Sequence, residues 1–192
     1  MAVDPASIWV DTFKLLPQDP TGDLAPTNIA NWVNDRVEGK LETSSQVVQF
    51  TPPPQFGWQK GIFEETLKAV CKIPSPIAAA PAIKLASAWK DAALASTFTI
   101  APGGNMNPPP SGTNGIVGEG VAVIDPPSVA LAYTYLVEQL SGALPVSDRS
   151  NSVLPKAFRQ AFLMLTYTIS GIDTKPPPSG PIPFSLPLTP VQ

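Results

Sequence analysis

The sequence predicts a mainly α fold: five or six helices in a small bundle-like body, with little β-structure and long proline-rich extended arms. Apolar residues recur at the spacing of one helix face in several segments of the chain. Apolar residues also make up 43% of the 192 residues, which is enough for a buried core. The 25 prolines are more than twice the usual share of about 5%, and they separate these segments from one another.

Two helices are expected in residues 1–51, an N-terminal helical segment and linker. Asp4 fits the N-cap of the first helix, and Pro5 fits its first helical position. The second helix begins at Asn28 and ends near Gly39, and turn-forming residues separate the two. The apolar stripes are Trp9, Phe13 and Leu16 in the first helix, and Ile29, Trp32, Val33 and Val37 in the second.

Three further helices are expected in a helical body that spans residues 52–174. The third helix covers Trp58–Ile73, the fourth begins at Pro76 or after Pro81, and the fifth follows Asp125, which fits a helix cap. Each of the three has one apolar face. These faces comprise Phe63, Thr66, Leu67 and Val70; Leu85, Trp89 and Ala92; and Val129, Tyr133, Leu136, Val137 and Leu140.

The sixth helix is predicted over Ser152–Gly171 and is apolar nearly all round. That pattern is typical of a helix buried in a core or against another subunit. One face carries Leu154, Phe158, Ala161, Phe162, Leu165 and Ile169, and the other carries Leu163, Met164 and Tyr167.

One extended strand is predicted over Gly115–Asp125, where valines alternate with small residues. A second is predicted over Ser44–Phe50, and its Val47–Phe50 part is the candidate pairing partner of the first. The glycines inside Gly115–Asp125 weaken that strand.

The pentapeptide PPPSG occurs twice, at Pro108–Gly112 and at Pro176–Gly180, and each copy ends a longer match. The segments 88–112 and 157–180 align over the preceding helix, with Trp89 opposite Phe158. We therefore predict an internal duplication of a unit with three parts: an amphipathic helix, a Thr-aromatic-Thr-Ile turn and a polyproline segment. Further matches are Lys90 with Arg159 and Phe98 with Tyr167, and identities at Ala88/Ala157, Ala92/Ala161, Leu94/Leu163, Thr97/Thr166, Thr99/Thr168 and Ile100/Ile169.

Residues 175–192 are predicted to be an extended proline-rich C-terminal arm. Apolar residues there alternate with prolines and small polar residues, which suits an arm lying in a groove of a neighbouring molecule better than a solvated linker. A polyproline segment is stiff before it binds, so docking it costs little conformational entropy. The predicted interface residues are Pro108, Pro109, Pro110, Pro176, Pro177, Pro178, Pro181, Ile182, Pro183, Phe184, Leu186 and Leu188.

The residue types that most enzymes need are missing from the sequence. There are no histidines, so the usual neutral-pH base and the commonest metal ligand are absent. The single cysteine, Cys71, lies on a predicted helix and is interpreted as an inert core thiol. We therefore expect no catalytic residues, no cofactor and no metal.

Charge and hydropathy limit the partners. A net charge of −3 argues against a protein that binds nucleic acid by neutralising phosphates. The chain lacks an apolar run of about 20 residues, so we expect no membrane partner, and we expect no signal peptide. Charged residues make up only 14% of the chain against a usual value of about 25%, which favours a surface covered by neighbouring subunits.

With its helix-then-arm units at 88–112 and 157–180 and its C-terminal arm, the chain resembles the small virion proteins of tailed bacteriophages. That resemblance implies a non-enzymatic, oligomeric structural protein whose partners are other subunits, copies of itself included, in the virion. A tail or baseplate position is the first interpretation, and a capsid cement (decoration) protein is the second. The alternative from another class is an adaptor that presents proline-rich linear motifs, such as Pro178-x-x-Pro181 or Pro187-x-x-Pro190.

Overall fold

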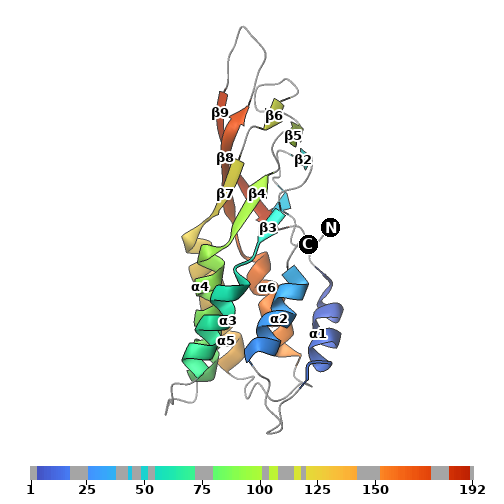
Figure 1. Cartoon of the computed structure of the whole chain (residues 1–192), viewed down its shortest axis with the longest axis vertical. Helices are drawn as coiled ribbons and strands as arrows, with labels where there is room; N and C mark the ends of the chain where they lie inside the picture. Colours follow the sequence, from blue (N-terminus) through green and yellow to red (C-terminus); the bar gives the residue numbers. More distant parts are fainter. Residues whose placement is uncertain are drawn as a thin grey trace.

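Six helices and nine strands form in the residues that the computed structural model describes, which are 4–17, 26–37, 43–44, 49–51, 55–71, 80–100, 104–107, 115–117, 120–141, 152–173 and 182–190. The helices gather in one half of the molecule, and the sheet extends away from them (Figure 1). The helices are α1 (Ala6–Lys14), α2 (Pro26–Val37), α3 (Lys60–Cys71), α4 (Ala80–Ala95), α5 (Pro126–Ser141) and α6 (Val153–Leu163). The strands are β1 (Thr43–Ser44), β2 (Gln49–Thr51), β3 (Gln55–Gly57), β4 (Thr97–Ile100), β5 (Gly104–Asn107), β6 (Gly115–Val117), β7 (Gly120–Ile124), β8 (Tyr167–Asp173) and β9 (Ile182–Pro190).

The predicted mainly helical fold is confirmed, and all six predicted helices are present among the described residues. The start of the first helix was wrong by one residue, because Pro5 and not Asp4 occupies the N-cap, without a side-chain cap hydrogen bond. The second helix begins at Pro26, two residues before Asn28, and proline is well suited to a first helical turn. The fourth begins at Ala80, between the two predicted starts.

The prediction that the sixth helix continues to Gly171 was wrong. α6 ends at Leu163, and Tyr167–Asp173 forms β8. The matching segment Thr97–Ile100, predicted as a turn, is β4. β-branched and aromatic residues dominate both segments and favour strands.

The strands form an antiparallel meander of five rows. Two consecutive strands make up each of the first three rows: β2 and β3, β4 and β5, and β6 and β7. β8 and β9 form the fourth and fifth rows, and each row pairs with the next in this order. From Val117 to Val121 the chain advances four residues, while its partner β8 advances three, from Asp173 to Ser170. One extra residue in the row of β6 and β7 is the mark of a β-bulge. The predicted pairing of Val47–Phe50 with Gly115–Asp125 was wrong, since β2 pairs with β5 instead.

The sheet curls, so that its first and last rows approach each other. β1 pairs with the end of β9, with Thr43 opposite Pro190, whereas β2 pairs with β5 at the other side of the sheet. Only residues 45–48 connect β1 to β2, and five Cα steps span at most about 18 Å. The end of β9 therefore lies close to the row that opens the sheet.

The core is one connected network of aromatic rings with Phe162 at its centre. Phe162 is fully buried, and its ring centroid lies 5.1 Å from that of Trp58, 5.6 Å from that of Trp89, 6.1 Å from that of Trp9 and 6.3 Å from that of Phe56. All four tryptophans, Trp9, Trp32, Trp58 and Trp89, are buried. The network also includes Phe13, Trp32, Phe63, Phe98, Phe158 and Tyr167.

Replacing Phe162 with alanine is expected to lower the free energy of unfolding by about 3–5 kcal/mol, because it removes a fully buried ring and leaves a cavity. Urea unfolding followed by circular dichroism measures the change. Leu131→Ala on α5 is the control, because Leu131 is 66% exposed and its truncation should change stability by about 0.5 kcal/mol or less. Equal losses for the two variants would contradict this account of the core.

Candidate functional site

The two PPPSG segments emerge from the same end of the sheet. Residues 108–114 connect β5 to β6, and residues 174–181 connect β8 to β9, so each pentapeptide joins two antiparallel rows of the sheet. Val117 of β6 pairs with Asp173 of β8, so the strand that follows the first pentapeptide lies beside the end of the strand that precedes the second. β4 and β8 start at the helical body, so this shared end is the one far from the helices (Figure 1).

One backbone hydrogen bond shows toward which neighbouring strand the backbone N–H and C=O groups of each β8 residue point. The Asp125 N–H donates to the Thr166 carbonyl over 2.9 Å, directly beyond the β7–β8 ladder. Polar backbone groups alternate between the two edges of an antiparallel strand. The backbone groups of Thr168, Ser170 and Ile172 therefore face β7, and those of the residues between them face β9.

The same alternation explains how a strand with three prolines pairs with β8 over seven positions, from Tyr167↔Leu188 to Asp173↔Ile182. The backbone of Pro183 and of Pro187 points to the outer edge of β9, where no ladder needs their missing N–H. Pro190 faces the β8 side, but the β8 ladder ends before it. Prolines thus occupy the outer edge of β9, a known way to block unwanted strand addition.

Of the predicted C-terminal arm, residues 182–190 form the strand β9. Ile182, Pro183, Phe184, Leu186 and Leu188 belong to β9, which pairs with β8 and β1 of the same chain. Prolines four residues apart share one edge of a strand, so Pro183 and Pro187 are compatible with this pairing. The remaining predicted interface residues, Pro108, Pro109, Pro110, Pro176, Pro177, Pro178 and Pro181, lie outside the described residues.

Three residues anchor the foot of β8 to the start of α5. The Ser128 hydroxyl donates to the Asp125 carbonyl over 2.7 Å and accepts from the Thr166 N–H at 3.0 Å. The Thr166 hydroxyl donates to Asp125 Oδ2 at 3.1 Å. Asp125 directly precedes α5, at the position predicted for a helix cap. Its carboxylate accepts the Thr166 hydrogen bond and so fixes the residue that leads into β8.

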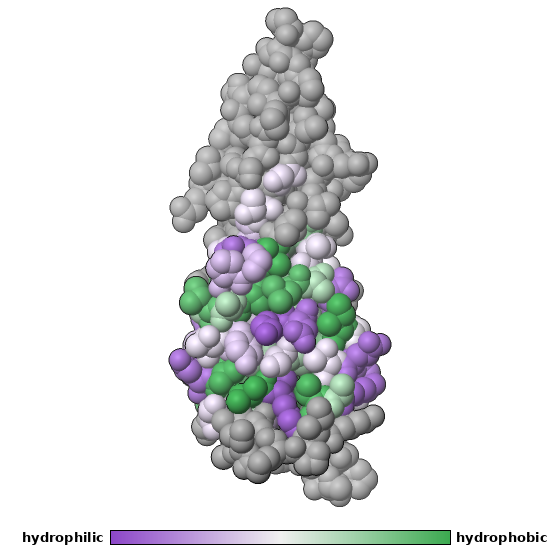
Figure 2. All heavy atoms as spheres, turned by 90° about the vertical axis from the view of Figure 1, so that its left-hand side faces the viewer, coloured by the Kyte–Doolittle hydropathy of each residue, from purple (hydrophilic) through white to green (hydrophobic). Residues whose placement is uncertain are grey.

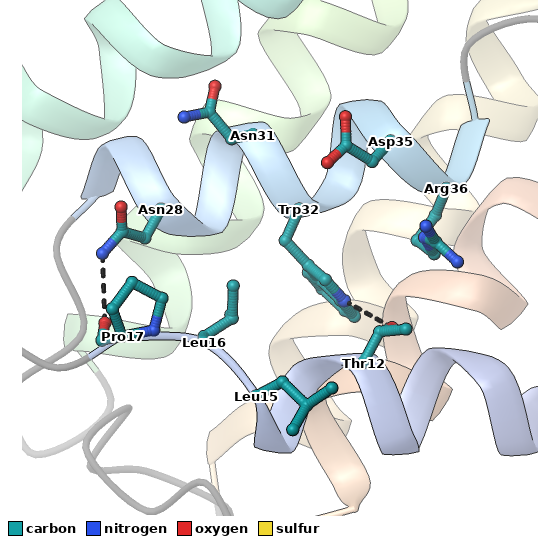
Figure 3. Close-up of a pocket in the computed structure, with 9 residues that line it drawn as sticks. All are labelled: Thr12, Leu15, Leu16, Pro17, Asn28, Asn31, Trp32, Asp35 and Arg36. Atoms are coloured by element: carbon teal, nitrogen blue, oxygen red, sulfur yellow. Dashed lines mark hydrogen bonds between the residues drawn. The ribbon is translucent and has the colours of Figure 1, made fainter.

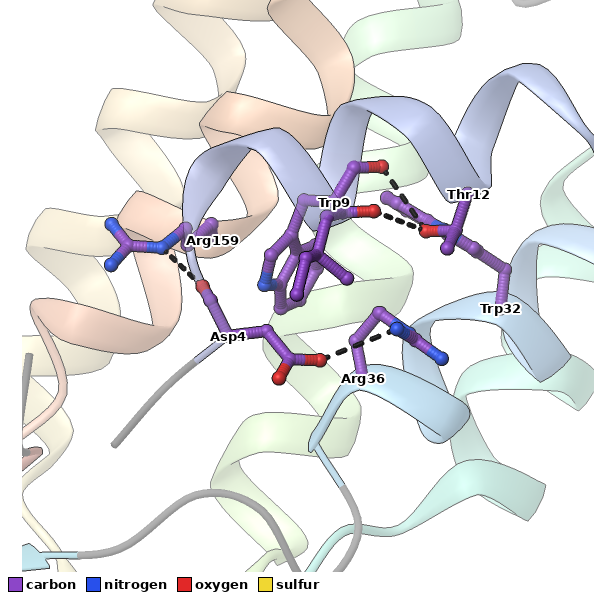
Figure 4. A network of polar contacts seen from close by, with 7 residues as sticks. Asp4, Trp9, Thr12, Trp32, Arg36 and Arg159 are labelled. Carbon is purple, nitrogen blue, oxygen red and sulfur yellow. Dashed lines mark hydrogen bonds and ion pairs between the residues drawn. The ribbon is translucent and has the colours of Figure 1, made fainter. Parts of the chain in front are cut away.

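A second polar network ties the N-terminal segment to the body (Figure 4). Asp4 Oδ2 lies 3.3 Å from Arg36 Nη1, and the Asp4 carbonyl accepts from Arg159 Nε over 2.7 Å. The Trp32 indole N–H donates to the Thr12 hydroxyl at 3.0 Å. These contacts join the N-terminal segment, α1 included, to α2 and α6.

An open groove of about 330 Å³ lies between the end of α1 and α2 (Figure 3). Leu15 at its rim is 80% exposed, and the Asn28 side-chain amide donates to the Pro17 carbonyl at 3.0 Å. Sequence reasoning did not find this groove, because no motif links the ends of two helices that are separated by a loop. Its hydrogen-bonded side chains hold the connection after α1 in place.

On the face that includes α4 and α5, apolar and polar residues are interspersed over the helical body (Figure 2). Ile83, Leu94 and Leu131 are exposed on these helices, and Lys90 Nζ lies 5.0 Å from the ring centroid of Tyr133. Singly exposed apolar residues are ordinary on protein surfaces. They define no patch from which a partner could be inferred.

Within the described ranges, no group of three or more potential metal-ligating side chains comes together. No helix in those ranges has the length and apolar character to cross a membrane. Cys71 is the last residue of α3, as the predicted helical position requires. Comparison with protein-family models, with curated proteins and with solved structures found no match.

Replacing Ser128 with alanine is expected to lower the free energy of unfolding by about 1–3 kcal/mol, because the Thr166 N–H loses its acceptor. Ser128 is 5% exposed, so water cannot readily take over that role. The matched control is Ser141→Ala at the exposed end of α5, where the hydroxyl donates only within its own helix. Chemical denaturation of the two variants measures the difference, and a control as destabilised as Ser128→Ala would refute the anchor.

Stability should fall in alkali because burial raises the pKa of the Tyr167 hydroxyl well above its ordinary value. The hydroxyl also has no hydrogen-bond partner among the described residues. In the unfolded chain the Tyr167 hydroxyl loses its proton at a pH of about 10, whereas in the folded protein it stays protonated at that pH. Its contribution to stability is therefore complete below that pH and is lost as the pH rises above it.

Tyr167→Phe is expected to flatten this alkaline loss, as measured by urea unfolding between pH about 8 and about 11. Tyr135→Phe is the comparison, because burial also raises the pKa of Tyr135, but that ring is only half-buried. An alkaline slope unchanged by Tyr167→Phe would show that another group causes it.

Proposed function

We propose that this chain is a non-enzymatic structural subunit of a larger assembly and that it attaches to neighbouring subunits through the far end of its sheet. The observation that supports this best is that two identical pentapeptides, Pro108–Gly112 and Pro176–Gly180, each connect two antiparallel strands, and that these strands pair with one another at one end of the sheet. From the first to the last residue of β8 there are six steps of about 3.4 Å, so this strand alone holds the end about 20 Å from the helices.

Proline-rich segments suit such attachment. Three consecutive prolines lack backbone donors and favour polyproline II geometry, so little entropy is lost when they dock into an apolar groove. Two copies on one sheet end also make the second docking event intramolecular, which raises the overall affinity.

The features of the helical body are consistent with a scaffold that supports the far end of the sheet. Its tryptophans fill the core, and its best-placed polar side chains, Asp4, Arg36, Asp125, Ser128 and Thr166, join secondary-structure elements to one another. The low share of charged residues, 14%, further favours a surface that neighbours cover.

Within this function, we infer a component of a tailed-bacteriophage virion, on the resemblance in sequence style described above. A tail or baseplate position is the first assignment and a capsid cement protein the second. The partners would be other structural subunits, copies of this chain among them.

The adaptor alternative is weakened by one observation. Pro187-x-x-Pro190 lies inside β9, where its backbone pairs with β8 and β1, and a proline-recognising domain needs a free polyproline II segment. Of the two motifs named for the adaptor, Pro178-x-x-Pro181 remains, and it lies in the connection that the assembly proposal also uses.

The proposal predicts that the purified chain forms a defined oligomer. This oligomer should depend on both PPPSG segments, Pro108–Gly112 and Pro176–Gly180, which are called the two tips below. A variant with serine at all of Pro108–Pro110 and Pro176–Pro178 is expected to sediment as a folded monomer at concentrations where the unmodified chain is oligomeric. Replacing one triple proline alone should weaken association less, because one docking segment remains. Sedimentation velocity over a concentration series measures this.

The matched control replaces Pro52–Pro54, the triple proline between β2 and β3, which is not at the sheet end. It loses as many prolines as either single-tip variant and should keep the oligomer. A strictly monomeric chain that binds a purified SH3 domain would support the adaptor and overturn the proposal. So would an oligomer unchanged by loss of both tips.

A further inference from the structure

We propose that β9 is exchanged between two copies of this chain: β9 of one copy pairs with β8 of the other in the register that it has with its own β8. This inference rests on the proposed function, since it names a second copy as a partner and gives the contact that joins them.

The docking surface is the edge of β8 that β9 covers. The ladder runs over seven positions without interruption, and β1 adds only two more, at Thr189 and Pro190. Among the described residues, no other strand pairs with β9. A second copy offers the same edge, so exchange conserves every contact of the strand and alters only the connection.

The connection between β8 and β9 favours the open form. It has eight residues, 174–181, longer than the two to five residues that are usual in hairpins, and four of them are prolines. Consecutive prolines hold the chain extended and resist a tight reversal. Extended at about 3.1 Å per residue, the connection can reach about 25 Å to a neighbouring copy.

The outer edge of β9 argues that exchange, and not edge-to-edge addition, joins the copies. Pro183 and Pro187 remove two outward N–H donors from that edge, as the alternation set by the Asp125–Thr166 hydrogen bond requires. A strand from another chain would find a broken ladder there. The inner edge keeps its N–H donors over the seven positions that pair with β8, from Ile182 to Leu188.

The first hairpin carries the same pentapeptide but cannot exchange in this way. β7 pairs with β4 on one edge and β8 on the other, and β6 pairs with β5 and β8. Removing this row would open two ladders at once. It therefore supplies an internal control for the experiment.

The test uses full-length chains in which Cys71 is serine and one new cysteine is introduced per chain. Ser170 and Ser185 are opposite each other, and the alternation makes them a non-hydrogen-bonded pair, with Cα atoms about 4.5 Å apart, close enough for a disulfide. S170C chains are mixed with S185C chains, incubated at a concentration where the protein is oligomeric, and oxidised mildly. The expected product is a covalent dimer that contains one chain of each kind, seen by mass spectrometry without reduction.

The control mixture pairs T99C with V121C, opposite residues of β4 and β7 that also form a non-hydrogen-bonded pair. It should give no such dimer, because β7 stays in its own sheet. A chain carrying S170C and S185C together should close an internal disulfide when diluted to the monomer, which shows that the substitutions leave the pairing intact.

Absence of the mixed S170C–S185C dimer in oligomeric samples would overturn the exchange, as would equal yields from the two mixtures. If the oligomer still depended on both tips in that case, the proposed function would stand without exchange. A chain that is monomeric at every concentration and forms only internal disulfides would remove both proposals.

Discussion

The structure depends above all on the packing of Phe162 between the helical body and the foot of the sheet. Trp9 approaches this ring from α1, Trp89 from α4, and Phe56 from β3, so one side chain of α6 joins helices to strands. Tyr167 follows Phe162 by five residues and also touches Phe56. The place where the sheet leaves the body is thereby fixed by aromatic contacts at the end of α6.

Once β8 starts at a fixed place, backbone alternation determines the rest of its surroundings. The Asp125–Thr166 hydrogen bond assigns one edge of β8 to β7 and leaves the other for β9. Within the stretch that pairs with β8, prolines must avoid the inner edge, and Pro183 and Pro187 meet this condition. The prolines of β9 are therefore compatible with a strand at the edge of the sheet. They would exclude the same segment from the middle of the sheet, where both edges need N–H donors.

The helices could be predicted from the sequence because their signal is local: Trp9 and Phe13, or Leu154 and Phe158, repeat at helical spacing within a few residues. Two strand segments could also be predicted, since β6 and β7 lie within Gly115–Asp125 and β2 overlaps Ser44–Phe50, but β4, β8 and β9 could not. Leu165 and Ile169 fit the helical period of the residues before them, so the change at Tyr167 was hidden. β9 depends on the register with a strand that precedes it by an eight-residue connection, and no local pattern encodes that register. The position of both PPPSG connections at one end of the sheet follows from the same strand pairing, so it could not be predicted from the sequence either.

The predicted duplication acquires a physical consequence in this sheet. Both units run helix, strand, PPPSG, strand; Trp89 and Phe158 are both fully buried; and Phe98 and Tyr167 meet edge to face with centroids 4.5 Å apart. β4 and β8 flank β7 on its two sides, so the strand after the first pentapeptide lies inside the sheet and the strand after the second lies at its edge. The two units thus differ in their place in the ladder: β6 and β7 are paired on both sides, whereas β9 pairs with β8 along its length and with β1 at only two positions.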